Sequence, residues 1–134
     1  MTIATKVIVV IAAIFGLLLT IAGAAGAHII AASGPLKVTW DSAMLFGFVH
    51  VVATLGAVSL PWGGRLKLVA AGLFLVGVKL FSLMLLAKTI AAANAGDAAN
   101  PLQMLSPLAP IGGFSFMFGW IVLAIAAVLG KRPA

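Results

Sequence analysis

The chain has 134 residues, of which 64% are hydrophobic and 7% are charged, and its formal net charge is +6. A soluble domain carries about 25% charged residues, so this chain has too few to cover a water-facing surface, and we expect a membrane protein. The basic residues are scattered or lie at segment ends, which argues against a nucleic-acid-binding surface. The absence of cysteine excludes disulfides, thiolate metal sites and a cysteine nucleophile.

Four apolar segments have about the 20 residues needed to cross the hydrocarbon core of a bilayer. They cover 7–27, 42–60, 66–87 and 114–129 of a single integral membrane domain, 1–134. The first segment exceeds the roughly 7–15 apolar residues of a signal peptide, so we interpret it as a retained span. The connections 28–41 and 88–113 are then outer loops. The sequence predicts an all-α, up-down four-helix membrane bundle.

The second span is framed by signals at both ends. Gly34-Pro35 before it is a pair that commonly stops a helix. Trp40 and Trp62 are about 33 Å apart on a helix, which predicts one tryptophan in each membrane interface. One helical face of this span is small or polar throughout, and we expect it to pack against other helices. That face consists of Ala43, Gly47, His50, Thr54 and Ala57.

The distribution of basic residues predicts the orientation of the bundle. Cytoplasmic segments carry an excess of lysine and arginine. With both termini inside, the cytoplasmic basic residues are Lys6, Arg65, Lys67, Lys131 and Arg132, and the outer ones are Lys37 and Lys88. We therefore expect both termini in the cytoplasm.

Three short motifs occur in order along the chain. Gly23-Ala24-Ala25-Gly26-Ala27-His28 ends the first span, Phe46-x-x-x-His50 lies in the second, and Pro110-Ile111-Gly112-Gly113 precedes Gly119-Trp120. With the four-span spacing, they resemble the YgdD-like family, domain of unknown function 423, which is related to eukaryotic transmembrane protein 256. The resemblance implies a small four-helix integral protein of the bacterial inner membrane, with no known activity. It makes structural candidates of Gly23, Gly26, His28, Phe46, Gly112, Gly113, Gly119 and Trp120.

The chain departs from the family pattern at two places. Where the family shows a Ser-Gly-Ser centre in the third span, this chain has Val76-Gly77-Val78 followed by Lys79. The loop before Pro110 is also longer than is usual in the family. Both departures indicate a divergent member that is adapted to one partner.

His50 and Lys79 lie deep within their spans. Each is nine residues, about 13.5 Å, from the outer end of its span, so an antiparallel arrangement puts them on one level. A charged lysine at such depth costs about 2.5–3.5 kcal/mol. One interpretation is a polar site made of His50, Lys79 and Ser82. The alternatives are a lysine that contacts a partner or extends towards the interface, and a histidine that packs with its nitrogens hydrogen-bonded.

The remaining polar residues have simpler interpretations. We expect His28 to be a cap or an interface anchor at the end of the first span. Asp41 either caps the second helix or pairs with Lys37 or Lys88. Trp120 is too deep for an interface tryptophan, so we expect it to pack and to find an acceptor for its indole N–H.

No residue set typical of an enzyme is present in the sequence. It shows no Ser-His-Asp set, no paired carboxylates and no phosphate loop. Two acidic residues are too few for hydrolytic acid–base chemistry. His28 and His50 differ in depth by roughly 10 Å, which argues against their joint ligation of haem. We expect no catalytic residue, no metal site and no cofactor.

These observations together predict a non-enzymatic protein of the bacterial inner membrane. We expect a scaffold or an accessory subunit of a larger membrane complex, whose partners are the bilayer and another membrane protein or further copies of itself. The alternative is a small transporter or channel that uses a polar pocket of His50 and Lys79, although no inverted repeat is evident.

Overall fold

The computed structural model describes residues 1–30, 34–95 and 100–130. The regular structure of these residues is helical, and no strand occurs among them. Four of the helices are long and apolar enough to cross a membrane. The predicted all-α fold with four potential spans is therefore confirmed.

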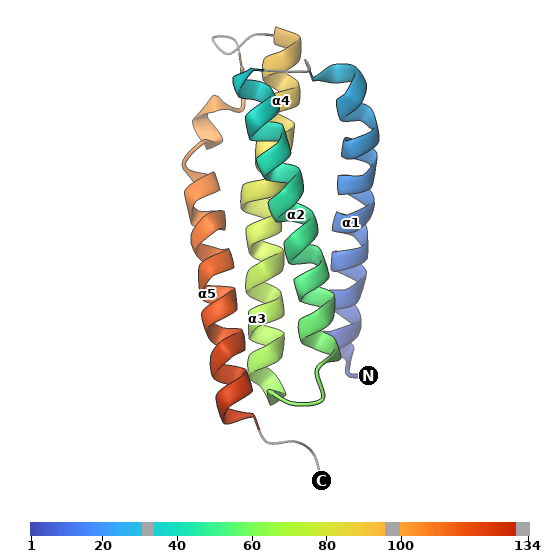
Figure 1. The fold of residues 1–134 in the computed structure, drawn as a ribbon, viewed down its shortest axis with the longest axis vertical. Coiled ribbons are helices and arrows are strands. Elements are labelled where there is room, and N and C mark those ends of the chain that lie inside the picture. The colour runs from blue at the N-terminus through green and yellow to red at the C-terminus, as the bar shows by residue number, and fades with distance from the viewer. Residues whose placement is uncertain (31–33, 96–99, 131–134) are drawn as a thin grey trace.

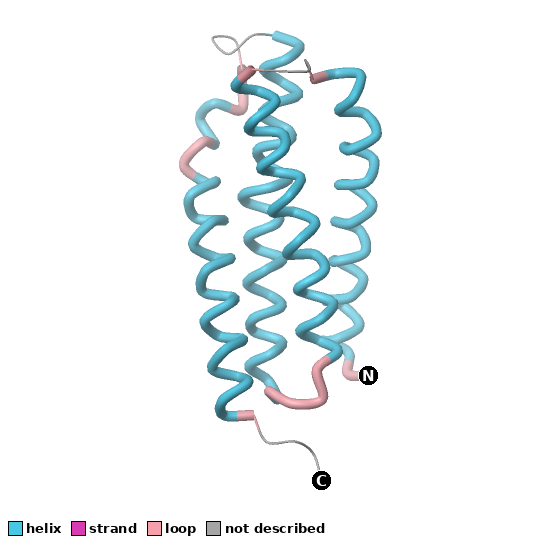
Figure 2. The backbone as a smooth tube through the Cα atoms, in the orientation of Figure 1, coloured by secondary structure: helices cyan, strands magenta, loops and turns pink. Residues whose placement is uncertain are grey.

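Helix α1 covers Ile3–Ile29 and α2 covers Pro35–Ser59. The third long helix is continuous from α3 (Gly64–Gly77) through a π-helical turn, η1 (Val78–Leu83), to α4 (Met84–Ala95). A short 3₁₀ turn, η3 (Gln103–Leu105), precedes α5 (Leu108–Leu129). Figure 1 shows the long helices side by side, with both termini at one end. Figure 2 shows that the turn between α2 and α3 lies at that same end.

The third long helix forms the middle of the bundle. It lies between α2 and α5, and α3 packs extensively on both of them (Figure 1). Helix α1 packs mainly on α2, and only 11% of its most apolar window is buried. The core therefore lies along the third long helix, and α1 contributes Ala12, Leu19 and Ile30 to it although most of α1 is exposed.

Two helices begin earlier than the sequence predicted, each near a proline. Helix α2 starts at Pro35, inside the expected outer loop 28–41, and α5 starts at Leu108, inside the expected outer loop 88–113. The N–H groups of the first helical turn have no acceptor within the helix, so a proline there removes no hydrogen bond. Gly34-Pro35 thus begins a helix instead of stopping one, and Pro110 lies in the first turn of α5.

These two connections are consequently shorter than expected. Helix α4 continues to Ala95, so the helical part of the chain also extends into the expected loop 88–113 from its other side. Residues 31–33 and 96–99, which belong to these connections, lie outside the described residues.

Glycines let the helices approach closely in the core. A Cβ on Gly112 would lie 2.5 Å from the backbone nitrogen of Phe81, so α5 rests on the backbone of η1. A Cβ on Gly26 would lie 2.5 Å from the ring of Trp40. Trp40 is therefore buried against α1, and its position in a membrane interface stays a prediction. Small residues at such crossings are typical of membrane helices.

The small and polar face predicted on α2 is buried as a whole. Its members are Ala43, Gly47, His50, Thr54 and Ala57. The Leu19 side chain of α1 and the Ser82 side chain of η1 both close over Gly47. This face therefore packs α2 against two helices at once, and it brings His50 into the interior.

Candidate functional site

Six side chains from four helical segments form a histidine–aromatic cluster that extends from the buried His50 to the exposed Phe46 and Trp120. They are Phe46 and His50 of α2, Phe74 of α3, Phe81 of η1, and Phe116 and Trp120 of α5. His50 stacks on Phe116, with ring centroids 3.7 Å apart and an angle of 17° between the planes. Phe46 packs on Phe81 edge-to-face at 5.4 Å. The cluster thus joins α2 to α5 across the third long helix.

Both ring nitrogens of His50 are hydrogen-bonded. Its Nε2 lies 3.1 Å from Nε1 of Trp120, and its Nδ1 lies 2.8 Å from the carbonyl oxygen of Phe46. An indole N–H can only donate, so Nε2 accepts, and Nδ1 carries the hydrogen that it donates to Phe46. These bonds select the neutral imidazole with Nδ1 protonated. The geometry is that of a hydrogen-bonded packing histidine, and His50 is the acceptor that the depth of Trp120 required.

The cluster borders a groove at the surface of the bundle, here called the aromatic groove. Its volume is about 330 Å³, and it is lined by Phe46, His50, Phe81, Gly113, Phe116, Met117 and Trp120. A Cβ on Gly113 would meet no atom within 4 Å, so this glycine leaves the groove open rather than bringing helices together. The imidazole and the indole bond to each other, and the groove therefore presents an apolar surface.

Lys79 lies on the other side of the third long helix. Phe74 contacts His50 and Phe81 contacts Phe46, so Lys79, which lies between the two phenylalanines in sequence, is level with His50 as predicted. At about 100° per residue, Lys79 points away from both phenylalanines, and it is exposed. It makes no hydrogen bond or ion pair with any residue that the structure describes.

Ser82 occupies a third environment. Its hydroxyl is fully buried where η1 packs on Gly47, and it has no hydrogen-bond partner among the described residues. Thr54 and Thr89, in regular α-helix, each donate to the carbonyl four residues earlier. The wider winding of a π-helix displaces that carbonyl, which explains the unpaired hydroxyl. The structure therefore does not bring His50, Lys79 and Ser82 together in one polar site.

The depth of Lys79 follows from the length of its helix. Lys79 is the middle residue of the 31-residue helical stretch Gly64–Asn94, about 22 Å from either end. A lysine side chain reaches only about 6 Å along a helix. In a ~30 Å hydrocarbon core centred on this helix, the ammonium group would remain about 9 Å below the surface. In a bilayer placed in this way, extension of the side chain would not bring the amino group of Lys79 to water.

Three charged side chains that the structure describes at the end of the bundle opposite the termini have partners. Lys37 and Asp41 form an ion pair on the surface of α2, so Asp41 takes one of its two predicted partners. The ammonium group of Lys88 donates instead to Oγ of Ser106 at 2.7 Å. His28 lies exposed in the last turn of α1, where the helix dipole favours a cation.

Asn100 attaches the connection between α4 and α5 to α4. Its side chain is buried, donates to the carbonyl of Lys88 at 3.0 Å, and accepts from the backbone N–H of Leu102 at 3.0 Å. The role of Asn100 was not predicted from the sequence. An Asn-Pro pair signals a turn, but nothing in it signals that the asparagine side chain is buried.

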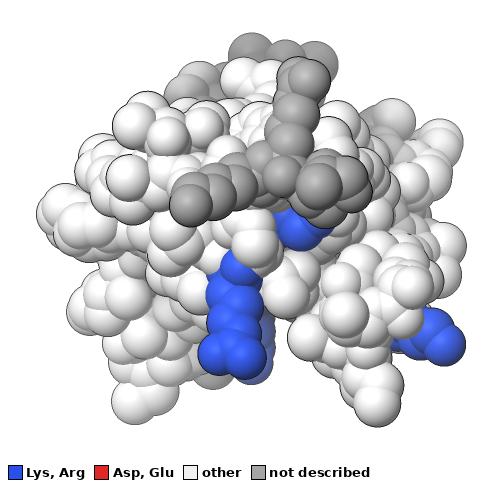
Figure 3. Space-filling view, turned by 90° about the horizontal axis from the view of Figure 1, so that it is seen from below, with Lys and Arg blue, Asp and Glu red and all other residues white. Residues whose placement is uncertain are grey.

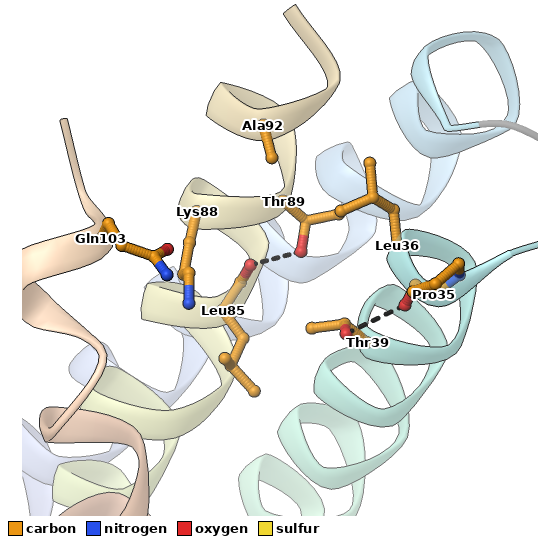
Figure 4. Close-up of a pocket in the computed structure, with 8 residues that line it drawn as sticks. All are labelled: Pro35, Leu36, Thr39, Leu85, Lys88, Thr89, Ala92 and Gln103. Carbon is orange, nitrogen blue, oxygen red and sulfur yellow. Dashed lines mark hydrogen bonds between the residues drawn. The ribbon is translucent and has the colours of Figure 1, made fainter. Parts of the chain in front are cut away.

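A cavity of about 280 Å³ lies beside this region, between the start of α2 and α4 (Figure 4). Thr39 and Thr89 line it, and each donates its hydroxyl hydrogen to the carbonyl four residues earlier. Lys88 and Gln103 lie next to each other on its opposite side (Figure 4). The cavity thus offers a cation and an amide, without a nucleophile or a carboxylate. Among the described residues, no group of three or more His, Asp or Glu could hold a metal ion.

The sequence matches the model of a family described as Protein of unknown function (DUF423), over residues 22–113. The chain belongs to this family. The predicted resemblance is thereby confirmed. No curated protein and no solved structure matches the chain.

In this DUF423 protein the motif residues fall into two groups. Those at close helix contacts are Gly23, Gly26, Gly112 and Gly119. Those that line the aromatic groove are Phe46, Gly113 and Trp120, together with His50. Gly119 and Trp120 lie beyond the residues that the family model matches, yet they pack on the third long helix, as the matched Gly112 does. His28 belongs to neither group.

Proposed function

We propose that this DUF423 protein is an integral protein of the bacterial inner membrane that has no catalysis of its own and serves as a scaffold or an accessory subunit of a larger membrane complex. The observation that carries the proposal is the exposed Lys79 at the middle of the third long helix. An unpaired lysine at the centre of a bilayer costs about 2.5–3.5 kcal/mol on insertion scales. A neighbouring membrane protein would supply the polar group that the described residues lack.

The exposure of the helices supports the same proposal. The four potential spans bury between 11% and 39% of their most apolar windows inside the fold. Most of each helix is therefore available to lipid or to a partner. A thin bundle of this kind suits a subunit that packs alongside a larger membrane protein.

The chemistry of the interior argues against catalysis. His50 is the buried ionisable residue of the cluster, and both of its nitrogens are engaged by Phe46 and Trp120. No carboxylate lies near it among the described residues. The cluster therefore has neither a free base nor a nucleophile.

The proposal includes an orientation with both termini in the cytoplasm. The end of the bundle with both termini (Figure 1), onto which Figure 3 looks, has Lys6, Arg65 and Lys67 among its described residues. Lys131 and Arg132, which belong to the same basic group, lie outside the described residues. The opposite end has Lys37 and Lys88, and Lys37 is paired with an aspartate. Cytoplasmic segments are the ones enriched in lysine and arginine.

The alternative, a small transporter or channel that uses His50 and Lys79, has less support. A path needs both residues to line one passage, and here one is buried while the other is exposed on the opposite side of a helix. If the protein were a transporter or channel, Lys79→Met and His50→Ala would each abolish its flux into liposomes. Unchanged flux in both variants would exclude this alternative.

Purification in a mild detergent tests the accessory role. We expect the full-length protein to be recovered from its native membrane in a larger assembly, at a fixed stoichiometry to at least one other membrane protein. Recovery as a lone monomer or as a homo-oligomer would contradict the proposal. A chromosomally tagged copy keeps the protein at its natural level and avoids an excess of free subunit.

A further inference from the structure

The surface around Lys79 is an apolar helical face with one charge, here called the Lys79 face. It consists of Val69, Gly72, Val76 and Lys79. Spacings of three and four residues put these side chains on one side of a helix. Val69 and Val76 are 50% and 45% exposed, and a Cβ on Gly72 would meet no atom within 4 Å. No described part of the chain covers this face.

A second copy of the chain cannot supply the counter-charge of Lys79. The sequence has two acidic residues, Asp41 and Asp97. Asp41 lies in the second turn of α2, at the outer end of the bundle, and is paired with Lys37. Asp97 follows the last residue of α4 in the chain. Copies in one bilayer share the same levels, so Asp41 of a neighbouring copy does not come level with Lys79. Asp97 lies outside the described residues, 18 positions along the chain from Lys79.

A lipid headgroup does not reach Lys79 either. Lipid phosphates lie outside the hydrocarbon core, and Lys79 is the middle residue of its helical stretch. The ammonium group therefore needs an anion that another chain carries into the membrane. Ionisable residues within membrane spans pair with one another, and a carboxylate is the side chain that complements a lysine.

Resting on the accessory role proposed above, we infer that the Lys79 face binds a transmembrane helix of a different protein, and that this helix carries an aspartate or glutamate at the level of Lys79. The carboxylate pairs with the Lys79 ammonium group in a low-dielectric environment, where such a pair is little screened. Gly72 lets the two helices approach closely, and Val69 and Val76 pack against the partner on either side of it.

Photo-crosslinking identifies what lies on this face. A photoreactive residue at Val76 is compared with one at Val52, which is 65% exposed on α2. After irradiation in native membranes, mass spectrometry identifies the captured peptide. We expect the Val76 position to capture a transmembrane segment with an aspartate or glutamate from a different protein, and the Val52 position not to capture it. Capture of a second copy, of lipid alone, or of a segment without an acidic residue overturns the inference.

Charge variants test the pair itself. Lys79→Arg retains the assembly, whereas Lys79→Met and Lys79→Glu weaken it by about 100-fold. Exchange of the captured acidic residue for lysine restores assembly with Lys79→Glu. Because Lys79 is exposed, all three variants fold, as their elution and thermal unfolding in detergent will verify.

The outcomes separate the two proposals. If the wild-type protein is recovered alone, the accessory role fails, and the docking of the Lys79 face fails with it. If the wild-type protein and Lys79→Met assemble equally well, the accessory role stands and the carboxylate partner is excluded.

Discussion

The indole N–H of Trp120 donates a hydrogen bond to Nε2 of His50 across 3.1 Å, and this bond links α5 to α2 over the third long helix. The two residues are 70 positions apart in the sequence. The stacking of His50 on Phe116 holds the imidazole in place from a second direction. The hydrogen bond between Trp120 and His50 therefore connects α5 and α2, the two helices on either side of the third long helix.

Loss of the indole donor should destabilise the bundle. Trp120→Phe keeps an aromatic ring but leaves Nε2 of the buried His50 without a partner, which we expect to lower the free energy of unfolding by about 1 kcal/mol. Thermal unfolding in detergent measures the change. The matched control is Trp62→Phe, in the turn between α2 and α3, with an expected effect below about 0.5 kcal/mol. Equal effects of the two substitutions would mean that the bond contributes nothing measurable.

The tautomer of His50 can be observed directly. We expect the ¹⁵N spectrum of histidine-labelled protein to show Nδ1 protonated and Nε2 unprotonated, because Nδ1 donates to Phe46 while Nε2 accepts from Trp120. In Trp120→Phe the same tautomer persists, and only the Nε2 resonance shifts. His28, exposed in the last turn of α1, provides the reference signal. A protonated Nε2 in the wild-type protein contradicts the assigned hydrogen bonds.

Two adjacent glycines should respond differently to one methyl group. A Cβ on Gly112 would lie 2.5 Å from the Phe81 nitrogen, whereas a Cβ on Gly113 would meet open space. Backbone atoms can move only slightly to make room, so Gly112→Ala should lower the free energy of unfolding by about 1–3 kcal/mol or more. Gly113→Ala should be neutral or slightly stabilising, because alanine is the better helix former. The free energies of unfolding of the two purified variants are measured under the same conditions and compared. Equal stabilities would contradict the close contact of α5 with η1.

Removal of the Asn100 side chain should release the connection between α4 and α5. Asn100→Ala deletes the bonds to the Lys88 carbonyl and to the Leu102 N–H. We expect hydrogen exchange in residues 100–106 to accelerate about tenfold, since such bonds contribute about 1 kcal/mol or more. The control is Asn94→Ala, whose side chain is exposed and donates to the carbonyl of Ile90. Unchanged exchange in Asn100→Ala would show that other contacts hold the connection.

The position of a residue along a helix was predictable from the sequence, whereas the direction in which its side chain points was not. His50 and Lys79 share a level because the rise per residue is fixed. Whether they face each other depends on the rotation of each helix, which side-chain packing decides. The buried face of α2 was predictable because its small residues differ visibly from the opposite side. The third long helix is apolar on all sides, so its sequence did not show that Lys79 points outwards.

Neither the hydrogen-bond acceptor of Trp120 nor the helix ends could be predicted from the sequence. The depth of Trp120 indicated that its indole needed an acceptor, but the identity of that acceptor depends on how α5 crosses α3 and η1. That crossing is set by contacts such as Gly112 with Phe81 and Gly119 with Phe74. The early starts of α2 and α5 were missed because a proline ends helices in the interior and begins them in the first turn.

The π-helical turn Val78–Leu83 gives the third long helix a tolerance for changes of length. A π turn holds more residues per turn than an α turn, so deletion of one residue from it lets the helix close as regular α-helix while the segments on both sides keep their packed faces. The same deletion within α3 would rotate Phe74 by about 100° out of the histidine–aromatic cluster. Single-residue deletions at each position from Gly64 to Leu86, assayed by the yield of folded protein, test this expectation. We expect deletions to be tolerated within the π turn and not before it. Lys79 lies inside that turn, so a deletion before it within the turn would move the charge around the helix without disturbing the fold.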